Sequence, residues 1–241
     1  MPHNRFEWLG RMKAVEREYA AMHPESRWKA SPAKWYRVDF PQGAEKPLVT
    51  ALMLESSMPR LTPKEWAEQK RWIAEQLSTS PARWKLACAH HPLFSNGSHG
   101  DNGVLQQEWG TIFKACGLDF YVGGHDHDLQ HLEIPNWPFT FVQAGGGGQS
   151  ITDMRRDLRG PFSRKVYGFV HLHLEGDRAD VRYVAAPDAR NHDVRVIHHF
   201  AREKETGKVT VVSTTGIDRA TTKPLKTLIG VGEEEKKDAK K

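Results

Sequence analysis

The chain has little of what would define a disulfide scaffold or a membrane protein. Only two cysteines, Cys88 and Cys116, occur among its 241 residues. Two thiols cannot form a disulfide framework, and both lie in apolar patterns, so we expect them to be free and buried. No apolar run is long enough to cross a bilayer, so we expect no membrane contact. The first residues also lack the apolar stretch of a signal peptide, which leaves the compartment unknown.

Lysine and arginine outnumber aspartate and glutamate by 35 to 30, which gives a formal net charge of +5. This charge suits anionic substrates, but it is spread along the chain, so we interpret it as a solvated surface and do not expect nucleic acid as a partner. The length allows one domain with a proper core and a small appendage. We predict a domain over residues 1–200 and a polar extension over 201–241, whose charged end is typical of disorder.

Two helices are predicted in the first third of the chain. Apolar residues recur at helical spacing over residues 5–22 and over residues 62–77. The second helix has complete start signals. Thr62 is placed as N-cap, Pro63 takes the first helical position, and Glu65 completes a capping box.

A strand–helix–strand unit is predicted next, with strands over 84–89 and 118–122 and a helix over 104–116. Two strands joined in this way are parallel, so their carboxyl ends lie at one edge of the sheet. His90 and His125 directly follow those two ends. We therefore expect these histidines to meet, and ligand sites of open α/β sheets form at this edge.

Later segments are rich in β patterns, with strands predicted over 139–143, 166–174 and 179–184. The fold class is therefore α/β. The glycine run 145–148 lacks the Lys-Ser/Thr of a phosphate-binding P-loop, so we interpret it as a tight loop. His171 and His173 are expected to lie on a sheet face, and His198 and His199 are expected to pack or to face solvent.

The segment His125-Asp126-His127 follows the second of these strands and a pair of glycines. The glycines let the backbone turn sharply, so both rings can point toward one centre. Neutral imidazoles bind zinc, iron and manganese well. Asp126 is placed to orient a ring from the second shell of such a site.

Two blocks of sequence resemble a known family. Residues 123–132, GGHDHDLQHL, resemble the last metal-binding block of the calcineurin-like metallophosphoesterases, and residues 89–95, AHHPLFS, resemble the block before it. The segment 95–100, SNGSHG, narrows the resemblance to purple acid phosphatases of the tartrate-resistant type. The resemblance runs from about residue 8 to about residue 200.

The resemblance implies the C-terminal part of an αββα sandwich, with parallel or mixed sheets flanked by helices. It also implies a dinuclear metal centre in which iron is paired with iron, zinc or manganese. By motif position, His90 and His125 would bind one metal and His127 the other. Such a pair of metals generates hydroxide from bound water and holds the phosphate oxygens during in-line attack.

The remaining site residues follow from the same resemblance. His99 matches a histidine that contacts the substrate and donates a proton to the leaving group. His91 and Asp126 are assigned to the second shell or to substrate contact. The reaction implied is hydrolysis of small phosphomonoesters.

Three earlier blocks of the family, which carry its aspartate and asparagine ligands, are absent. Asp39 is the only aspartate before His90, and it lies in a strand-like segment. Three neutral histidines cannot offset the charge of two neighbouring cations. We therefore expect a chain that lacks the N-terminal part of the family domain. It should be weakly active or inactive alone and complemented by a missing N-terminal half.

Two other functions stay open at this point. One is a non-catalytic remnant that binds at most one metal, which the missing acidic blocks favour. The other is a phosphodiesterase of the same superfamily. The loop around His99 favours the phosphomonoesterase over the diesterase.

Overall fold

The computed structural model describes residues 33–155, 158–187 and 192–214, together with residues 15, 18, 19 and 21–23. The chain divides into two compact units, residues 1–36 and 37–241. In the first unit, residues 15, 18, 19, 21 and 22 are helical, and the rest of the helix predicted over 5–22 lies outside the described residues.

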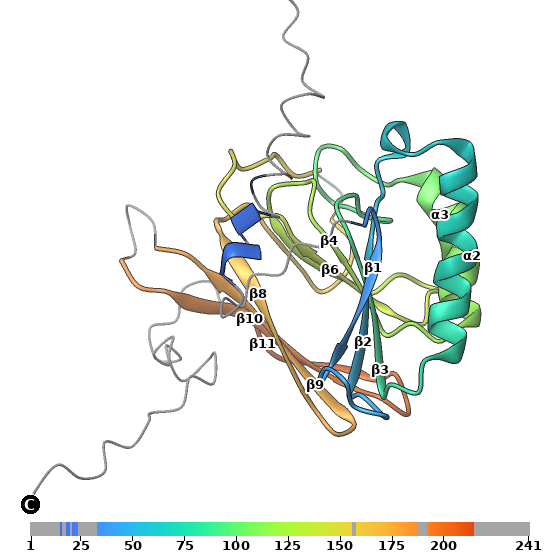
Figure 1. Cartoon of the computed structure of the whole chain (residues 1–241). Coiled ribbons are helices and arrows are strands. Elements are labelled where there is room, and N and C mark those ends of the chain that lie inside the picture. Colours follow the sequence, from blue (N-terminus) through green and yellow to red (C-terminus); the bar gives the residue numbers. More distant parts are fainter. Residues whose placement is uncertain are drawn as a thin grey trace, which may run out of the picture. The chain divides into compact units, whose positions relative to one another are not determined.

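The second unit is built on a seven-stranded mixed sheet (Figure 1). Four of its strands, β2, β3, β4 and β6, are parallel neighbours, and β5 and β7 are antiparallel additions. The parallel pairing of β3 with β4, which aligns Leu86 with Phe120, confirms the predicted strand–helix–strand unit. In sheet order the strands are β1 (Tyr36–Phe40), β2 (Val49–Leu54), β3 (Trp84–Ala89), β4 (Phe120–Gly123), β6 (Thr140–Ala144), β5 (Leu129–Leu132) and β7 (Phe162–Arg164).

Two long helices, α2 (Pro63–Thr79) and α3 (Gly103–Ala115), follow β2 and β3, and a short 3-10 helix, η1 (Met58–Arg60), precedes α2. The predicted capping box is confirmed. Thr62 Oγ1 accepts the Glu65 amide at 3.2 Å, and Glu65 Oε2 accepts the Thr62 amide at 2.8 Å. Gly117 stops α3 with a φ of 66°, a left-handed value that favours glycine.

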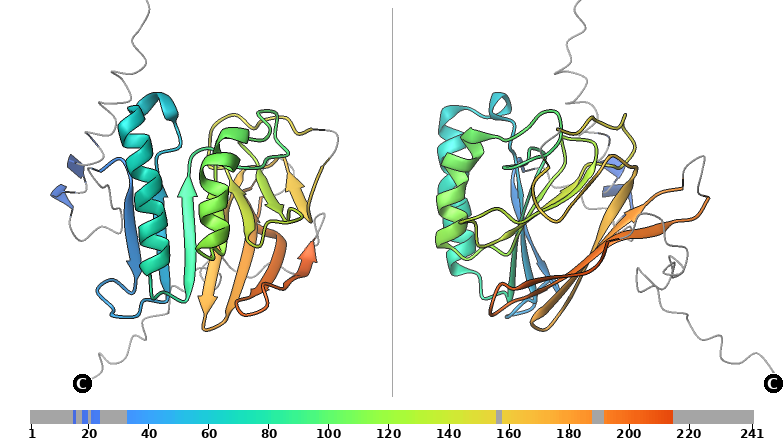
Figure 2. Two further views of the ribbon diagram at one scale, coloured as in Figure 1. Left: turned by 90° about the vertical axis from the view of Figure 1, so that its right-hand side faces the viewer. Right: turned by 180° about the vertical axis from the view of Figure 1, so that it is seen from behind.

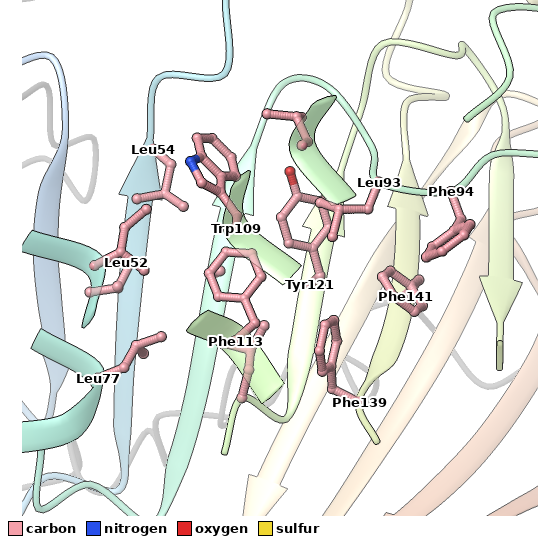
Figure 3. Packing of buried hydrophobic residues seen from close by; sticks show 14 of the residues in the cluster. Leu52, Leu54, Leu77, Leu93, Phe94, Trp109, Phe113, Tyr121, Phe139 and Phe141 are labelled. Atoms are coloured by element: carbon pink, nitrogen blue, oxygen red, sulfur yellow. The ribbon is translucent and has the colours of Figure 1, made fainter. Parts of the chain in front are cut away.

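Both helices lie against the same face of the first sheet (Figures 1 and 2). Large buried side chains fill the layer between the helices and this sheet face. Figure 3 shows Trp109 and Phe113 of α3 facing Leu52 of β2 and Tyr121 of β4. Each of these four is at most 1% exposed. This core fixes the strand ends from which the site residues project.

The other face of the first sheet packs on a second, antiparallel sheet. Its strands, in order, are β11 (Val209–Thr214), β10 (Arg195–Glu203), β9 (Arg178–Ala185) and β8 (Gly168–Glu175). Trp84 and Phe120 of the first sheet share a buried cluster with Val181 and Phe200 of the second. The mixed α/β class is confirmed. The described residues form one helix layer and two sheets.

Strand β10 runs through residue 200, where we predicted the domain to end. β11 then pairs with β10, so residues 201–214 continue the second sheet. The polar composition of this segment reflects strands that bury only one face. Residues 215–241, with the predicted disordered end, lie outside the described residues. None of the helices in the described part of the chain has the length and apolarity needed to cross a membrane.

Candidate metal centre

His90 and His125 meet at the carboxyl edge of the first sheet, as predicted. His90 follows β3 and His125 follows β4, and His90 Nε2 lies 3.0 Å from His125 Nδ1. The two loops are joined by the Gly124 amide, which donates to the His90 carbonyl at 3.0 Å. His125 has a φ of 56°, which is uncommon for a residue with a side chain. This backbone conformation turns the His125 ring toward His90.

His91 completes a cluster of three imidazoles. One ligand nitrogen from each of His90, His91 and His125 lies within 4.8 Å of the other two. The ring of His91 is held by Ser56, just beyond β2, whose Oγ is 2.9 Å from His91 Nδ1 and accepts the His91 amide at 2.9 Å. The role of His91 in the second shell or in substrate contact stays a prediction, and the geometry also places one of its nitrogens with those of the two predicted ligands.

All three rings of the cluster favour the neutral form. Burial, followed by the charge of the neighbouring His125, lowers the pKa of His91 to about 4. Burial is also the largest cause of the lowered pKa values of His90 and His125. Neutral imidazoles present lone pairs, so this donor set fits one zinc, iron or manganese ion. It does not fit two metals, because no carboxylate among the described residues joins the cluster.

His99 is anchored by Asp126. His99 Nδ1 lies 2.6 Å from Asp126 Oδ1, and the His99 amide donates to the same oxygen at 3.1 Å. Since a carboxylate accepts only, Nδ1 carries the proton and Nε2 is left for a substrate. We predicted that Asp126 orients a ring, and the ring that it contacts is that of His99.

Asp126 itself is held by burial, by a hydrogen bond and by close packing against two glycines. It is fully buried, and its Oδ2 accepts the Ser95 hydroxyl at 2.5 Å. A Cβ at Gly97 would lie 2.2 Å from Asp126 Cγ, and one at Gly145 would lie 1.9 Å from the Asp126 carbonyl oxygen. The first glycine of the run 145–148 therefore serves close packing, which agrees with a tight loop.

His127 points to a different partner. Its Nδ1 donates to the Ser150 carbonyl at 2.7 Å, which leaves Nε2 as the nitrogen with a lone pair. His127 does not belong to the cluster of His90, His91 and His125. Its assignment to a second metal stays a prediction.

An open cleft of about 200 Å³ lies beside the cluster. His91, His99 and His125 line it together with Asp101 and the first residues of α3. The rings of His99 and His125 are close, with centroids 4.3 Å apart. Two cluster histidines and the predicted proton donor thus face one space, which is large enough for a phosphate group.

Sequence analysis missed a carboxylate at the same sheet edge. Glu55 directly follows β2 and is 8% exposed, and its Oε1 accepts the Ser57 amide at 2.9 Å. Its charge partly opposes the burial that lowers the pKa of His90. The signal for Glu55 in the sequence is its position at the end of an apolar strand.

A second pair of histidines, also missed, lies buried between the two sheets. His131 Nδ1 is 2.9 Å from His198 Nε2, and both side chains are inaccessible to solvent. His131 Nε2 lies 2.8 Å from Glu133 Oε1, and His198 Nδ1 lies 2.7 Å from Thr214 Oγ1. His198 packs, as expected, and it belongs to a hydrogen-bonded chain that joins β5 to β10 and β11.

Comparisons with known proteins agree with this geometry. The model of the calcineurin-like phosphoesterase family matches residues 18–129. Purple acid phosphatase 17 of Arabidopsis thaliana is 42% identical over 80 residues, which are 33% of this chain and 24% of that protein. Tartrate-resistant acid phosphatase type 5 of Mus musculus is 24% identical over 195 residues, covering 71% of this chain and 59% of that protein.

Solved structures show the same fold at low sequence identity. Purple acid phosphatase PPD1 from yellow lupin superposes with a TM-score of 0.58 at 17% identity, over 75% of this chain and 35% of that one. GAP50, described as the anchor in the inner membrane complex of Plasmodium, superposes with a TM-score of 0.53 at 16% identity, over 84% and 65%. The chain spans between 24% and 59% of the length of the two curated relatives named above.

Proposed function

We propose that this chain, which matches the calcineurin-like phosphoesterase model over residues 18–129 and is similar to purple acid phosphatases, hydrolyses phosphomonoesters at a metal ion held by His90, His91 and His125. The observation that supports this proposal most directly is the shared cleft. Two of these imidazoles line it together with His99, which has an acceptor nitrogen free. Small phosphate esters are the proposed substrates.

In the proposed reaction, the metal and the pair His99–Asp126 have different roles. When bound, the metal supplies Lewis acidity to the phosphate oxygens and to the attacking water. His99 in its protonated form donates from Nε2 to the leaving oxygen, while Asp126 accepts from Nδ1 and stabilises the positive ring. The buried Ser95–Asp126 contact keeps this pair in place.

A second metal is part of the family centre, with iron paired with iron, zinc or manganese, and His127 is the proposed histidine for it. The described residues provide no carboxylate in the histidine cluster to balance the added charge. We therefore propose that the carboxylates for a dinuclear centre come from a polypeptide segment outside the described residues. With its own described residues the chain would hold one metal and turn over slowly.

Two alternatives remain as outcomes of the test. A non-catalytic module would keep one metal and show no turnover, and the all-histidine donor set is the observation that favours it. The fold is compatible with such a role, since a chain described as an anchor shares it. A phosphodiesterase would prefer a diester over the corresponding monoester.

The deciding experiment combines metal analysis with two substrates. The purified chain is loaded with iron, zinc or manganese, its metal content is measured, and para-nitrophenyl phosphate is compared with bis(para-nitrophenyl) phosphate. We expect one metal per chain and turnover of the monoester alone. Metal binding without any turnover would support the non-catalytic module, and faster cleavage of the diester would support the phosphodiesterase.

A matched pair of variants ties the activity to this site. His99→Gln should keep the metal and lower kcat by about a hundredfold, the usual contribution of a general acid. His173→Gln replaces a histidine that is half exposed on β8 and remote from the cleft. It should leave both metal content and kcat unchanged.

A further inference from the structure

Arg155 lies on a segment that runs along the loop carrying His99. Met154 forms an isolated antiparallel bridge with Gly97, and the Arg155 amide donates to the Asn96 carbonyl at 2.8 Å. These two contacts place the start of the Arg155 side chain beside residues 96–97. The position of Arg155 is therefore set by backbone hydrogen bonds on an ordered part of the loop.

The guanidinium of Arg155 reaches the rim of the cleft. A Cβ at Gly100 would lie 3.6 Å from Arg155 Nη1, and Gly100 is one of the residues that line the cleft. Asp101, another lining residue, is partly buried, which raises its pKa, but hydrogen bonds from Arg159 and the Ser95 amide lower it more, and the charge of Arg155 adds a smaller lowering. Because Gly100 has no side chain, it places no side-chain atom between the Arg155 guanidinium and the space next to His99.

Among the described residues, Arg155 has no ion-pair partner of its own. Asp101 is already engaged by Arg159, whose Nη1 and Nη2 lie 2.9 and 2.6 Å from the two carboxylate oxygens. The Arg155 side chain is exposed and makes no hydrogen bond or ion pair with the part of the chain that the structure describes. Of the three described charges, those of Asp101, Arg155 and Arg159, the charge of Arg155 is thus the one without a hydrogen-bonded partner at the mouth of the cleft.

We propose that Arg155 binds a second anionic group of the substrate, next to the phosphate that reacts. On this proposal the reacting phosphate lies against His91, His99 and His125 in the cleft, and the second group lies near Gly100, where Arg155 Nη1 comes within 3.6 Å of the position of a Cβ. A guanidinium fork matches a carboxylate or a phosphate in two-point contact. This inference rests on the proposed function and narrows its substrates to phosphomonoesters that also carry a carboxylate or a second phosphate.

The test uses two esters that differ only in the second charge, phenyl phosphate and para-carboxyphenyl phosphate. Arg155→Ala should raise KM for the carboxylated ester about tenfold, the effect of one charge-assisted contact. For phenyl phosphate KM should change less than about twofold, and kcat should be unchanged for both esters. Arg155→Lys, which keeps the charge without the fork, should fall between these values.

Arg71→Ala is the matched control, since Arg71 is an exposed arginine on α2 outside the cleft lining. It should change neither ester. A rise in KM of equal size for both esters in Arg155→Ala would overturn the proposal, because Arg155 would then bind the reacting phosphate itself. No change for either ester would overturn it as well.

A binding measurement separates this inference from the proposed function. Both esters are titrated into the metal-free chain, and the amide resonances of His99 and Gly100 are followed by NMR. Tighter binding of para-carboxyphenyl phosphate, lost in Arg155→Ala, supports the role of Arg155 even in a chain without turnover. Turnover with equal binding of both esters supports the proposed function and overturns the role of Arg155.

Discussion

His90, His91 and His125 meet beside an open cleft, whereas His131 and His198 meet in the buried layer between two sheets. Both groups bring ring nitrogens to about 3 Å and both have lowered pKa values. They differ in what the remaining nitrogens do. In the buried pair every ring nitrogen has a partner.

The buried pair is a one-way chain of hydrogen bonds. Glu133 can only accept, so His131 Nε2 donates to it and His131 Nδ1 must accept from His198 Nε2. His198 Nδ1 then accepts the hydroxyl of Thr214. Because every lone pair and proton is already used, this pair is structural, although its two rings are as close as those of His90 and His125.

The open cluster leaves nitrogens without partners. Among the described residues, His90 Nδ1, His91 Nε2 and His125 Nε2 make no hydrogen bond. Lone pairs that lie close together and lack a protein partner are what a metal ion requires. Ring nitrogens without a hydrogen-bond partner, and not the proximity of histidines, therefore distinguish a binding site from a core contact.

The largest expected effect tests this distinction through metal affinity. His125→Ala should weaken zinc binding by about a hundredfold, since a protein ligand contributes about 3 kcal/mol. His198→Gln should leave the affinity unchanged. Competition with a chelator of known affinity measures both, and loss of zinc binding in His198→Gln would remove the difference between the two groups.

For the free energy of unfolding, a substitution in the buried pair should have a larger effect than one in the open cluster. His131→Ala should lower the free energy of unfolding by about 3 kcal/mol, because it removes one buried hydrogen bond from each of Glu133 and His198 and opens a cavity. His90→Ala should change it by less than about 0.5 kcal/mol in the metal-free chain. Urea unfolding measures both values. Equal destabilisation by the two variants would contradict a structural role restricted to the buried pair.

A smaller effect is expected at the residue that orients His91. Ser56→Ala removes the hydroxyl that holds His91 Nδ1 and should weaken zinc binding about tenfold, as is usual for such outer contacts. The neighbouring Ser57→Ala is the control, since the structure shows a contact of its amide with Glu55 and none of its hydroxyl. Equal zinc affinity in the two variants would show that Ser56 does not position the ring.

The smallest expected effect is a pH dependence of stability. Burial, followed by the charge of His131, lowers the pKa of His198 from 6.5 to about 3, so the unfolded chain takes up this proton first. Stability is therefore full above pH 6.5 and falls as the pH drops toward 3. Between pH 7 and pH 5.5 the loss from one such ring is about 1 kcal/mol.

His198→Gln keeps a donor and an acceptor but cannot titrate, so its unfolding free energy should depend less on pH by that amount. Urea unfolding of the metal-free proteins at the two pH values gives the difference. His173→Gln, on the exposed part of β8, should retain the dependence of the unaltered chain. An unchanged slope in His198→Gln would contradict a buried neutral ring.

The strand–helix–strand unit and the approach of His90 to His125 could be predicted because both depend on local patterns. Apolar runs define β3 and β4, a helix between them makes them parallel, and parallel strands end at one edge. The capping box of α2 is equally local. Sequence alone was enough wherever the determining residues lie within one supersecondary unit.

The parts that escaped prediction depend on contacts between distant segments. His91 turns into the cluster because Ser56, in the loop after another strand, holds its ring. The pairing of His131 with His198 depends on how one sheet sits on the other, which no alternation within a strand records. Likewise, Arg155 reaches the cleft through a bridge between Met154 and Gly97 that has no sequence signature.

The close packing of Gly97 and Gly145 against Asp126 makes the site sensitive to the addition of a single methyl group at either glycine. At Gly97 and at Gly145 a single methyl group would occupy space already filled by Asp126. Either Gly→Ala substitution would therefore displace His99 without touching any residue that meets the substrate. In a search for active relatives of this chain, small residues at these two positions are as informative as the histidines themselves.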